Sequence, residues 1–238
     1  MRTMMFVVSV ILLSSFGIAL APLADIVIDG KFGDWEPVKG YPDDEGDTFG
    51  GTEDATMDIL SYMIANDDDF LYVTVTVKEN ISEGKTSRGA YQTVLDTDND
   101  YNTGIQTDTE APYPPHEQPM GVDRYISLET DTGIVEGVGM AGFEEDADEI
   151  GGPGEFELPQ AICEVEVLDN RYELSADLKS LDIELESEIR VTILHYSAAD
   201  TIDWTMPAIT YLVTLQEPGV VDARGSSLVT WGSLKSEY

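Results

Sequence analysis

The feature that most constrains the fold is an alternation of apolar and polar residues that recurs in short segments along the chain. In the segment FLYVTVTV, residues 70–77, every second position is Leu or Val. A period of two places alternate side chains on opposite faces of a β-strand, whereas an amphipathic helix needs a period of 3.6, which is hardly seen here. The pattern therefore predicts an all-β protein.

Turns rich in Asp, Asn and Gly separate these segments, as in NDDD at 66–69 and TDTG at 130–133. So many short strands with short turns indicate one antiparallel β-sandwich of two sheets, of the jelly-roll or immunoglobulin-like kind. Two longer loops, 103–121 and 142–159, are where binding is expected. The strands are expected at 56–65, 70–77, 90–95, 122–129, 134–138, 162–167, 171–178, 189–196, 209–215 and 227–231.

The two ends of the chain differ from this pattern. Arg2 precedes an apolar run from Met4 to Leu20, which is followed by small residues up to Ala24. We expect residues 1–24 to be a secretory signal peptide, with an uncleaved membrane anchor as the alternative; both place the rest outside the cytoplasm. The sandwich is expected over 25–216. Residues 217–238 form a C-terminal tail or an extra strand, which would pair with its own sheet or with a neighbour's edge.

The charge of the chain limits its partners. Asp and Glu number 47 and Lys and Arg only 12, a formal net charge of -35, so nucleic acid is excluded as a partner. Cations are favoured instead, although an acidic surface also keeps proteins hydrated in saline or hot surroundings. The hydrophobic share of 42% is enough for a core. The one cysteine, Cys163, has no partner for an internal disulfide and is expected to be buried.

The segment LDTDNDYNTG, residues 95–104, places Asp96, Asp98 and Asp100 at every second position directly after an expected strand. Their mutual repulsion favours a bound cation, and calcium accepts such irregular sets of oxygen ligands. The segment is no EF-hand, because Tyr101 and Thr107 stand where that loop needs Gly and Glu. The alternative is a turn whose side chains bond their own backbone amides.

Other metal sites have weaker support. Asp54 and Asp58 are candidates for a second calcium site. Transition metals are disfavoured, because His116, His195 and one cysteine make no soft ligand cluster.

Several segments, in this order, resemble the carbohydrate-binding module family 9 type of β-sandwich, whose superfamily also includes DOMON and ethylbenzene-dehydrogenase haem-binding domains. They are IVIDGKFGDW (26–35), DATMDILSYMIANDDDFLYVTVTV (54–77), YQTVLDTDNDYNTG (91–104), GVDRYISL (121–128) and YELSADLKSL (172–181). The resemblance implies a calcium turn closed by Thr103 and Gly104, with Asp123 approaching from the adjacent strand. It also implies that Trp35 is a packing residue.

The same resemblance implies a sugar held between two tryptophans. Only Trp204, in a loop before a late strand, matches such a position; its alternative is a residue folded onto the sandwich. The second wall would be Tyr113, Tyr41 or Trp231.

Haem ligated by Met and His, as in other members of the superfamily, is a further alternative. The candidate ligands are His116 with Met120, or His195 with Met206, and their spacing is not diagnostic.

The sequence shows no catalytic signature, so we expect a non-catalytic protein. Two hypotheses follow. The first is a secreted carbohydrate-binding module that calcium stabilises and that holds a glycan through loop aromatics. The second is an extracellular surface, matrix or filament protein of the same fold whose acidic faces are bridged by calcium, with self-association through calcium or the C-terminal strand.

Overall fold

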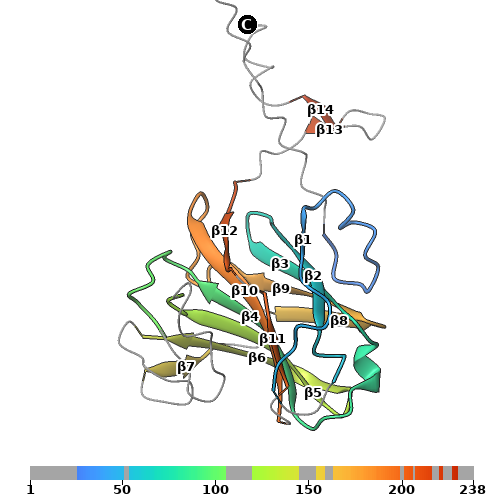
Figure 1. Cartoon of the computed structure of the whole chain (residues 1–238). Helices are drawn as coiled ribbons and strands as arrows, with labels where there is room; N and C mark the ends of the chain where they lie inside the picture. The colour runs from blue at the N-terminus through green and yellow to red at the C-terminus, as the bar shows by residue number, and fades with distance from the viewer. Residues whose placement is uncertain are drawn as a thin grey trace, which may run out of the picture.

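Two antiparallel β-sheets face each other across one hydrophobic core, as Figure 1 shows for this computed structural model. The first sheet has the strand order β1-β2-β3-β9-β8, and the second has the order β11-β10-β4-β5-β6-β7, with β12 also paired to β10. The predicted two-sheet sandwich is thereby confirmed. The structure describes residues 26–50, 54–105, 120–144, 154–158, 163–198, 201–205, 207–215, 220–221 and 227–229.

The five-stranded sheet consists of β1 (Gly40–Pro42), β2 (Ile59–Asn66), β3 (Phe70–Val77), β8 (Cys163–Leu168) and β9 (Arg171–Asp177). The seven-stranded sheet consists of β4 (Gly89–Asp96), β5 (Arg124–Asp131), β6 (Ile134–Phe143), β7 (Glu155–Glu157), β10 (Glu188–Ser197), β11 (Ile202–Trp204) and β12 (Ile209–Leu212). A 3₁₀ turn, η1, covers Ile81–Glu83, and the short strands β13 (Val220–Val221) and β14 (Ser227–Val229) pair with each other. No helix in the described ranges is long and apolar enough to cross a membrane.

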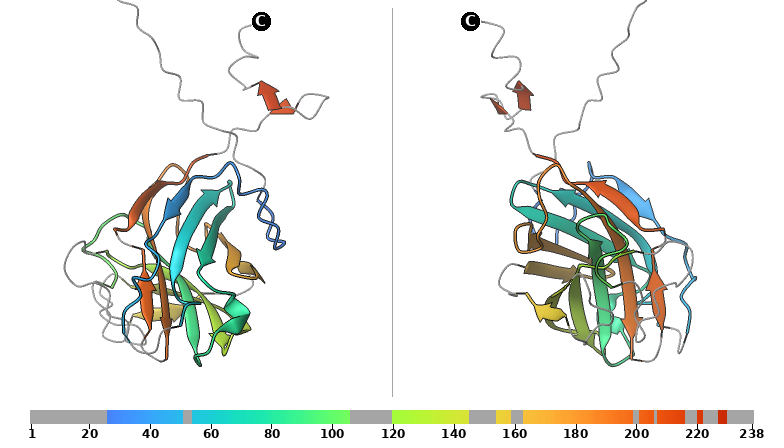
Figure 2. Two further views of the ribbon diagram at one scale, coloured as in Figure 1. Left: turned by 45° about the vertical axis from the view of Figure 1, so that its right-hand side comes forward. Right: turned by 90° about the vertical axis from the view of Figure 1, so that its left-hand side faces the viewer.

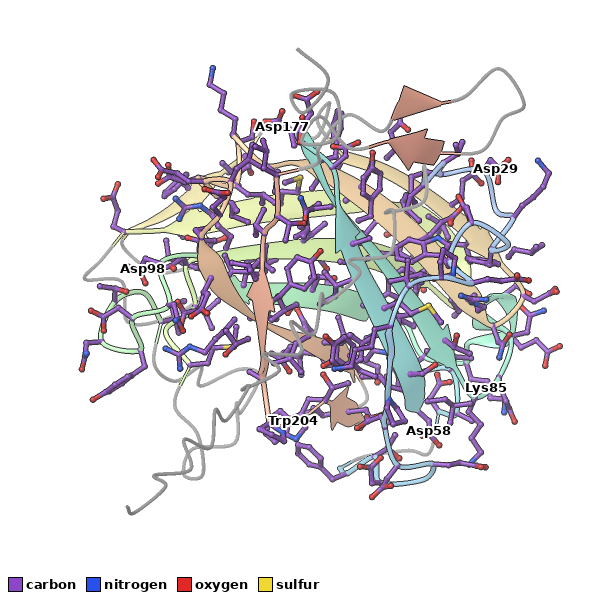
Figure 3. All side chains as sticks on the ribbon, turned by 90° about the horizontal axis from the view of Figure 1, so that it is seen from above. Asp29, Asp58, Lys85, Asp98, Asp177 and Trp204 are labelled. Atoms are coloured by element: carbon purple, nitrogen blue, oxygen red, sulfur yellow. The ribbon has the colours of Figure 1, made fainter. Side chains whose placement is uncertain are left out.

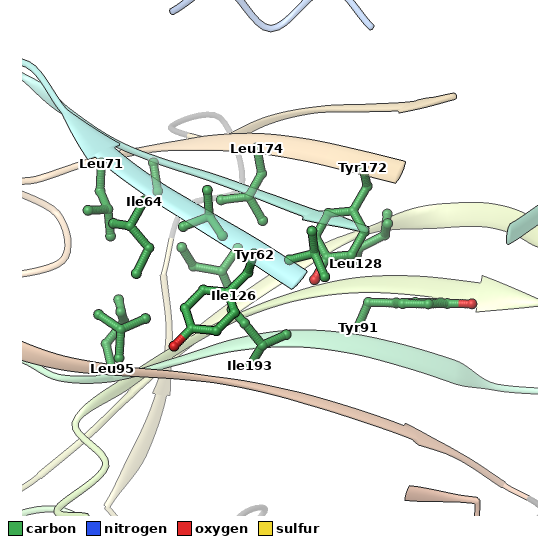
Figure 4. Close-up of a cluster of buried hydrophobic side chains, with 14 of the residues drawn as sticks. Tyr62, Ile64, Leu71, Tyr91, Leu95, Ile126, Leu128, Tyr172, Leu174 and Ile193 are labelled. Atoms are coloured by element: carbon green, nitrogen blue, oxygen red, sulfur yellow. The ribbon is translucent and has the colours of Figure 1, made fainter. Parts of the chain in front are cut away.

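The period-two pattern decides which side chains enter the core. In β3 the aliphatic residues Leu71, Val73, Val75 and Val77 all belong to the core between the sheets. In β4 the inward residues are Tyr91 and Leu95; Figure 4 shows them across the core from Leu174 and Tyr172 of β9, and the rings of Tyr91 and Tyr172 are in edge-to-face contact, with centroids 5.8 Å apart. Burial of these large apolar side chains is the main force that holds the two sheets together.

Both sheets also carry smaller apolar clusters on their outer faces. On the five-stranded sheet, the segment before β1 packs Trp35 against Tyr72 and Ala65. Glu173 of β9, fully buried, accepts hydrogen bonds from the amide of Gly30 (2.6 Å) and from Nε1 of Trp35 (2.9 Å). This contact fixes the N-terminal segment to the sheet, and it agrees with the expected packing role of Trp35.

β4 is covered on both faces, since all eight of its residues are buried. Its outward residue Val94 belongs to a second cluster with Leu194, Phe143 and the loop residues Ile105 and Val122. The chain that follows β4 therefore folds back over the outer face of the seven-stranded sheet, on the side shown in the right panel of Figure 2.

The structure also corrects details of the sequence analysis. The strands β1, β7 and β11 were not predicted, and the expected loop at 142–159 holds the end of β6 and all of β7. Cys163 is partly exposed rather than buried, at the start of the edge strand β8. The proposed signal peptide at 1–24 lies outside the described residues. Of the tail at 217–238, only β13 and β14 are described, and they pair with each other.

Candidate metal site and ligand-binding face

Three carboxylates meet where β4 ends and β5 begins. Asp96 is the last residue of β4, Asp98 lies in the turn that follows, and Asp123 directly precedes β5. Because Leu95 and Arg124 are antiparallel partners, the next residues along, Asp96 and Asp123, lie side by side. One carboxylate oxygen from each of the three aspartates lies within 4.8 Å of the others.

Backbone amides hold two of these carboxylates in place. Oδ2 of Asp123 accepts a hydrogen bond from the amide of Thr97 (2.7 Å), and Oδ1 of Asp98 accepts one from the amide of Asp100 (2.8 Å). The hydroxyl of Thr103 also donates to Asp98 (3.0 Å). These bonds form the tight turn that the Asp and Asn content predicts.

Asp96 is bonded differently, although it is the most buried of the three. Its exposed fraction is 0%, and neither carboxylate oxygen accepts a well-aligned hydrogen bond in the described part of the chain. Nη2 of Arg190, on the neighbouring strand β10, lies 2.8 Å from Oδ2, so that oxygen has an ion-pair partner. The backbone amide of Asn99 lies close enough to lower the pKa of this carboxyl, but Oδ1 accepts no well-aligned hydrogen bond among the described residues, although buried polar atoms in native proteins nearly always have one.

The pKa of Asp96 is raised to about 7, chiefly by burial and to a smaller extent by the charges of Asp123 and Asp98, against the opposing effects of Arg190 and the backbone of Asn99. Burial also raises the pKa of Asp123. Both shifts have the same main cause: burial disfavours the charged form of these carboxylates, and a bound cation would offset that effect. Oxygen ligands of this kind suit a hard cation.

Two glycines allow the turn to approach these carboxylates. Gly104 has φ +63, and a Cβ there would lie 2.3 Å from the carbonyl oxygen of Val122 and 2.8 Å from Oδ1 of Asp123. A Cβ on Gly121 would lie 2.3 Å from the carbonyl oxygen of Thr103. The loop therefore closes at Thr103 and Gly104, the place that the family resemblance implies.

The other predicted metal ligands lie elsewhere. Asp100 is exposed and is not one of the grouped carboxylates; its Oδ1 accepts hydrogen bonds from the amide (3.0 Å) and Nδ2 (2.6 Å) of Asn102. Asp54 accepts hydrogen bonds from Thr56 and Thr86, and Asp58 pairs with Nζ of Lys78 at 3.1 Å. The structure thus brings three of the four predicted ligands together, and it gives Asp54 and Asp58 separate structural contacts.

A second acidic group, which the sequence analysis missed, consists of Asp43, Asp47 and Asp203. Asp203, on β11, accepts hydrogen bonds from the amides of Ile59 (2.5 Å) and Trp204 (2.9 Å). Burial, with a further contribution from Asp47, raises the pKa of Asp43 to about 7, and burial raises that of Asp203 to about 7. The run DDEGD at 43–47 was the available signal, but nothing in the sequence pairs it with Asp203.

Trp204 lies in the strand β11, and the prediction that it lies in a loop was wrong. Its backbone pairs with Leu194, and it packs at the edge of the outer cluster of the seven-stranded sheet, half-buried. The ring beside it is Phe49, with centroids 5.2 Å apart and planes tilted by 58°. Figure 3 shows Trp204 and Asp98 at separate places on the molecule, so they belong to two sites.

The other aromatic candidates are not placed beside Trp204 by the structure. Tyr113 and Trp231 lie outside the described residues. Tyr41 stacks on Tyr62 within the five-stranded sheet, with ring centroids 5.2 Å apart. Phe49, not considered from the sequence, is therefore the aromatic neighbour that the described residues provide.

His195, a candidate haem ligand, lies in the core with both ring nitrogens engaged. Nε2 lies 3.1 Å from the hydroxyl of Tyr172, and Nδ1 lies 3.2 Å from the carbonyl oxygen of Met57. Burial lowers its pKa to about 3, so the ring is neutral. These contacts assign His195 a structural role; His116 and Met206 lie outside the described residues.

Comparison with known proteins adds no relative: no protein-family model matches the chain, and no curated protein matches it significantly.

Proposed function

We propose that this chain is a secreted, non-catalytic β-sandwich domain that calcium stabilises and that binds a glycan, in the manner of the carbohydrate-binding module family 9 type. The observation that carries the calcium part is Asp96, a fully buried carboxylate that accepts no well-aligned hydrogen bond in the described structure and has two further carboxylates within reach. A buried charge of this kind is costly unless it is paired or coordinates a metal.

Calcium fits this donor set better than other ions do. Asp96, Asp98 and Asp123 would supply carboxylate oxygens, which hard cations prefer. The turn around them is irregular, which suits the variable coordination of calcium better than the strict octahedron of magnesium. With calcium bound, the ends of β4 and β5 and the turn between them would be held together by one ion.

The glycan part is supported by the aromatic pair of Trp204 and Phe49. Phe49 is 41% exposed and Trp204 is half-buried, so ring surface is available to a ligand. Flat aromatic faces offer apolar area to the C–H groups of a sugar ring. The net charge of -35 favours neutral saccharides over acidic ones.

The calcium site is tested by thermal unfolding of Asp98→Ala in calcium and in chelator. We expect the variant to lose more thermal stability in calcium than in chelator, where only the hydrogen bonds from Asp100 and Thr103 are lost. Asp100→Ala is the matched control, since Asp100 lies in the same turn but outside the carboxylate group. This substitution should lower the unfolding temperature by the same amount in calcium and in chelator. An equal loss for Asp98→Ala in calcium and in chelator rejects the site.

A second candidate function is calcium-bridged assembly of an extracellular matrix or filament. The group of Asp43, Asp47 and Asp203 favours it, because Asp47 is exposed and would offer a carboxylate to a shared ion. Growth of light scattering on addition of calcium, without a response to any saccharide, would favour assembly over glycan binding.

A further inference from the structure

The outer face of the five-stranded sheet carries a cavity of about 320 Å³ beside the N-terminal segment. Three adjacent strands form its floor (Figure 1): Tyr72 of β3 pairs with Ser175 of β9, and Ser175 pairs with Glu164 of β8. The three residues therefore make one row across the sheet. Glu164 and Val27, which also line the cavity, are exposed, so a ligand can enter it from solvent.

This row faces away from the core between the sheets. Leu71 on β3 and Leu174 on β9 belong to that core. Since alternate side chains of a strand point to opposite faces, the next residues along, Tyr72 and Ser175, point outward. Glu164 is the exposed member of the row on the edge strand β8.

The walls of the cavity are apolar and aromatic. Residues 26–28, with the sequence Ile-Val-Ile, form one wall, and Phe70 forms another part of the lining. The ring centroids of Phe70 and Tyr72 lie 6.3 Å apart, with the planes tilted by 48°. Ser175, in the middle of the row, has a small side chain that leaves the floor low. The cavity thus offers contact area to the apolar body of a ligand.

The charge of the cavity is negative. Glu164 is exposed, and among the described residues its carboxylate has no ion-pair or hydrogen-bond partner. None of the residues that line the cavity is basic. The pKa of Tyr72 is raised chiefly by burial, with further contributions from Asp67, Glu164 and Asp69, so three carboxylates lie near this ring. A cation is therefore favoured in the cavity and an anion is disfavoured.

We propose that this cavity binds a small organic cation, a primary ammonium group carried on an apolar body. The ammonium group would donate hydrogen bonds to the carboxylate of Glu164 and to the hydroxyl oxygen of Ser175. The body would lie against the rings of Phe70 and Tyr72 and the wall of residues 26–28. The inference does not depend on the proposed calcium or glycan binding, because the cavity lies on the other sheet.

The size of the cavity also limits the ligand. Its volume is at the lower end of the range for small-molecule sites, which is about 300–1,000 Å³, so it suits a compact amine. Tyr72 and Glu164 are two strands apart, a span of about 10 Å at the spacing of neighbouring strands. An amine with one aromatic ring can therefore contact both. Its charge is attracted by the carboxylate and also by the faces of the two aromatic rings.

The test is a nuclear magnetic resonance titration of the full chain at physiological salt. The ligands are phenethylammonium, its neutral analogue phenethyl alcohol, and the anion phenylacetate. Glu164→Gln removes the charge and keeps the shape of the side chain. Glu166→Gln is the matched control, because Glu166 is exposed on the same face of β8 but does not line the cavity. Both variants change the net charge equally, so general attraction of cations to this acidic protein affects them alike.

A third variant, Ser175→Met, fills the floor of the cavity. We expect wild type to bind phenethylammonium about fivefold more tightly than phenethyl alcohol, and phenylacetate more weakly than either. Glu164→Gln should remove this preference and Glu166→Gln should keep it. Ser175→Met should weaken the binding of both the ammonium ion and the alcohol.

Three results would overturn the inference. The first is an equal loss of phenethylammonium binding in Glu164→Gln and Glu166→Gln, which would show that only the overall charge attracts the cation. The second is equally tight binding of the ammonium ion and the alcohol by wild type. The third is no binding of either ligand. Each of these results would leave the proposed calcium and glycan sites in place.

Discussion

Arg190 and Asp96 are cross-strand partners on β10 and β4, and Nη2 of Arg190 lies 2.8 Å from Oδ2 of Asp96. Their side chains are 19% and 0% exposed, so this ion pair is largely shielded from water. The arginine neutralises one oxygen of the carboxylate, and Asp96 also offers an oxygen that lies within 4.8 Å of carboxylate oxygens of Asp98 and Asp123. The protein's own cation and the proposed calcium would therefore share one carboxylate.

Replacement of Arg190 tests this sharing. We expect Arg190→Met to destabilise the calcium-free protein by about 2 kcal/mol, because a buried carboxylate loses its charged partner. In saturating calcium the loss should be smaller, because the ion continues to neutralise Asp96. Urea unfolding in calcium and in chelator measures both values, and a larger loss in calcium would contradict the sharing.

The calcium-free protein should lose stability as the pH rises. The pKa of Asp96 is about 7 in the folded protein and 3.8 in the unfolded chain, so the folded state holds the proton more tightly. Its contribution is fully present below about pH 4 and is lost as the pH rises through about 7, at up to about 1.4 kcal/mol per pH unit.

Asp96→Asn isolates this contribution, because Asp43 and Asp203 also have pKa values of about 7 and remain in the variant. Unfolding in chelator from pH 4 to pH 8 should give a flatter profile for Asp96→Asn than for wild type. Parallel profiles would show that Asp96 is ionised throughout this range.

Gly104→Ala should destabilise the turn through both backbone strain and contact. Its φ of +63 disfavours any side chain, and the new Cβ would collide with the carbonyl of Val122. Gly46→Ala is the control, since Gly46 has φ +84 but nothing within 4 Å of its Cβ position. We expect Gly46→Ala to lower the free energy of unfolding by about 1 kcal/mol through backbone strain alone, and Gly104→Ala to lower it clearly more. An equal loss of stability in the two variants, measured by denaturant unfolding, would mean that the loop around Gly104 can shift to accommodate the new Cβ.

Glu173→Gln should lower stability by the same amount with and without calcium. Glu173 is fully buried and accepts hydrogen bonds from the segment before β1, on the sheet opposite the proposed calcium site. Loss of its charge weakens those bonds, by about 2 kcal/mol in total. A calcium-dependent loss, seen in melting curves, would show that the two regions are coupled.

The fold was predictable because apolar and polar residues alternate regularly along its longer strands, as in the FLYVTVTV segment of β3. The carboxylate turn was predictable for a similar reason: Asp96 and Asp98 are close in sequence, and the family resemblance pointed to Asp123. Asp100 was misplaced because alternation along a strand stops at the turn, where its side chain bonds Asn102 instead.

Contacts between distant segments were not predictable. β11 has only three residues, too few for a period, so Trp204 was placed in a loop and Asp203 was not considered. The ring of Phe49 lies beside that of Trp204 because Phe49 and Ile202 form an isolated β-bridge. No sequence pattern predicts such a bridge. The row of Tyr72, Ser175 and Glu164 likewise depends on the register of β3, β9 and β8.

The most direct test of the calcium site is isothermal titration of calcium into chelator-treated wild type and Asp96→Asn at pH 7.5. We predict that the variant binds one calcium ion fewer than the wild type, whatever the group of Asp43, Asp47 and Asp203 contributes to both. The same number of bound ions and the same affinity in the two proteins would contradict the account.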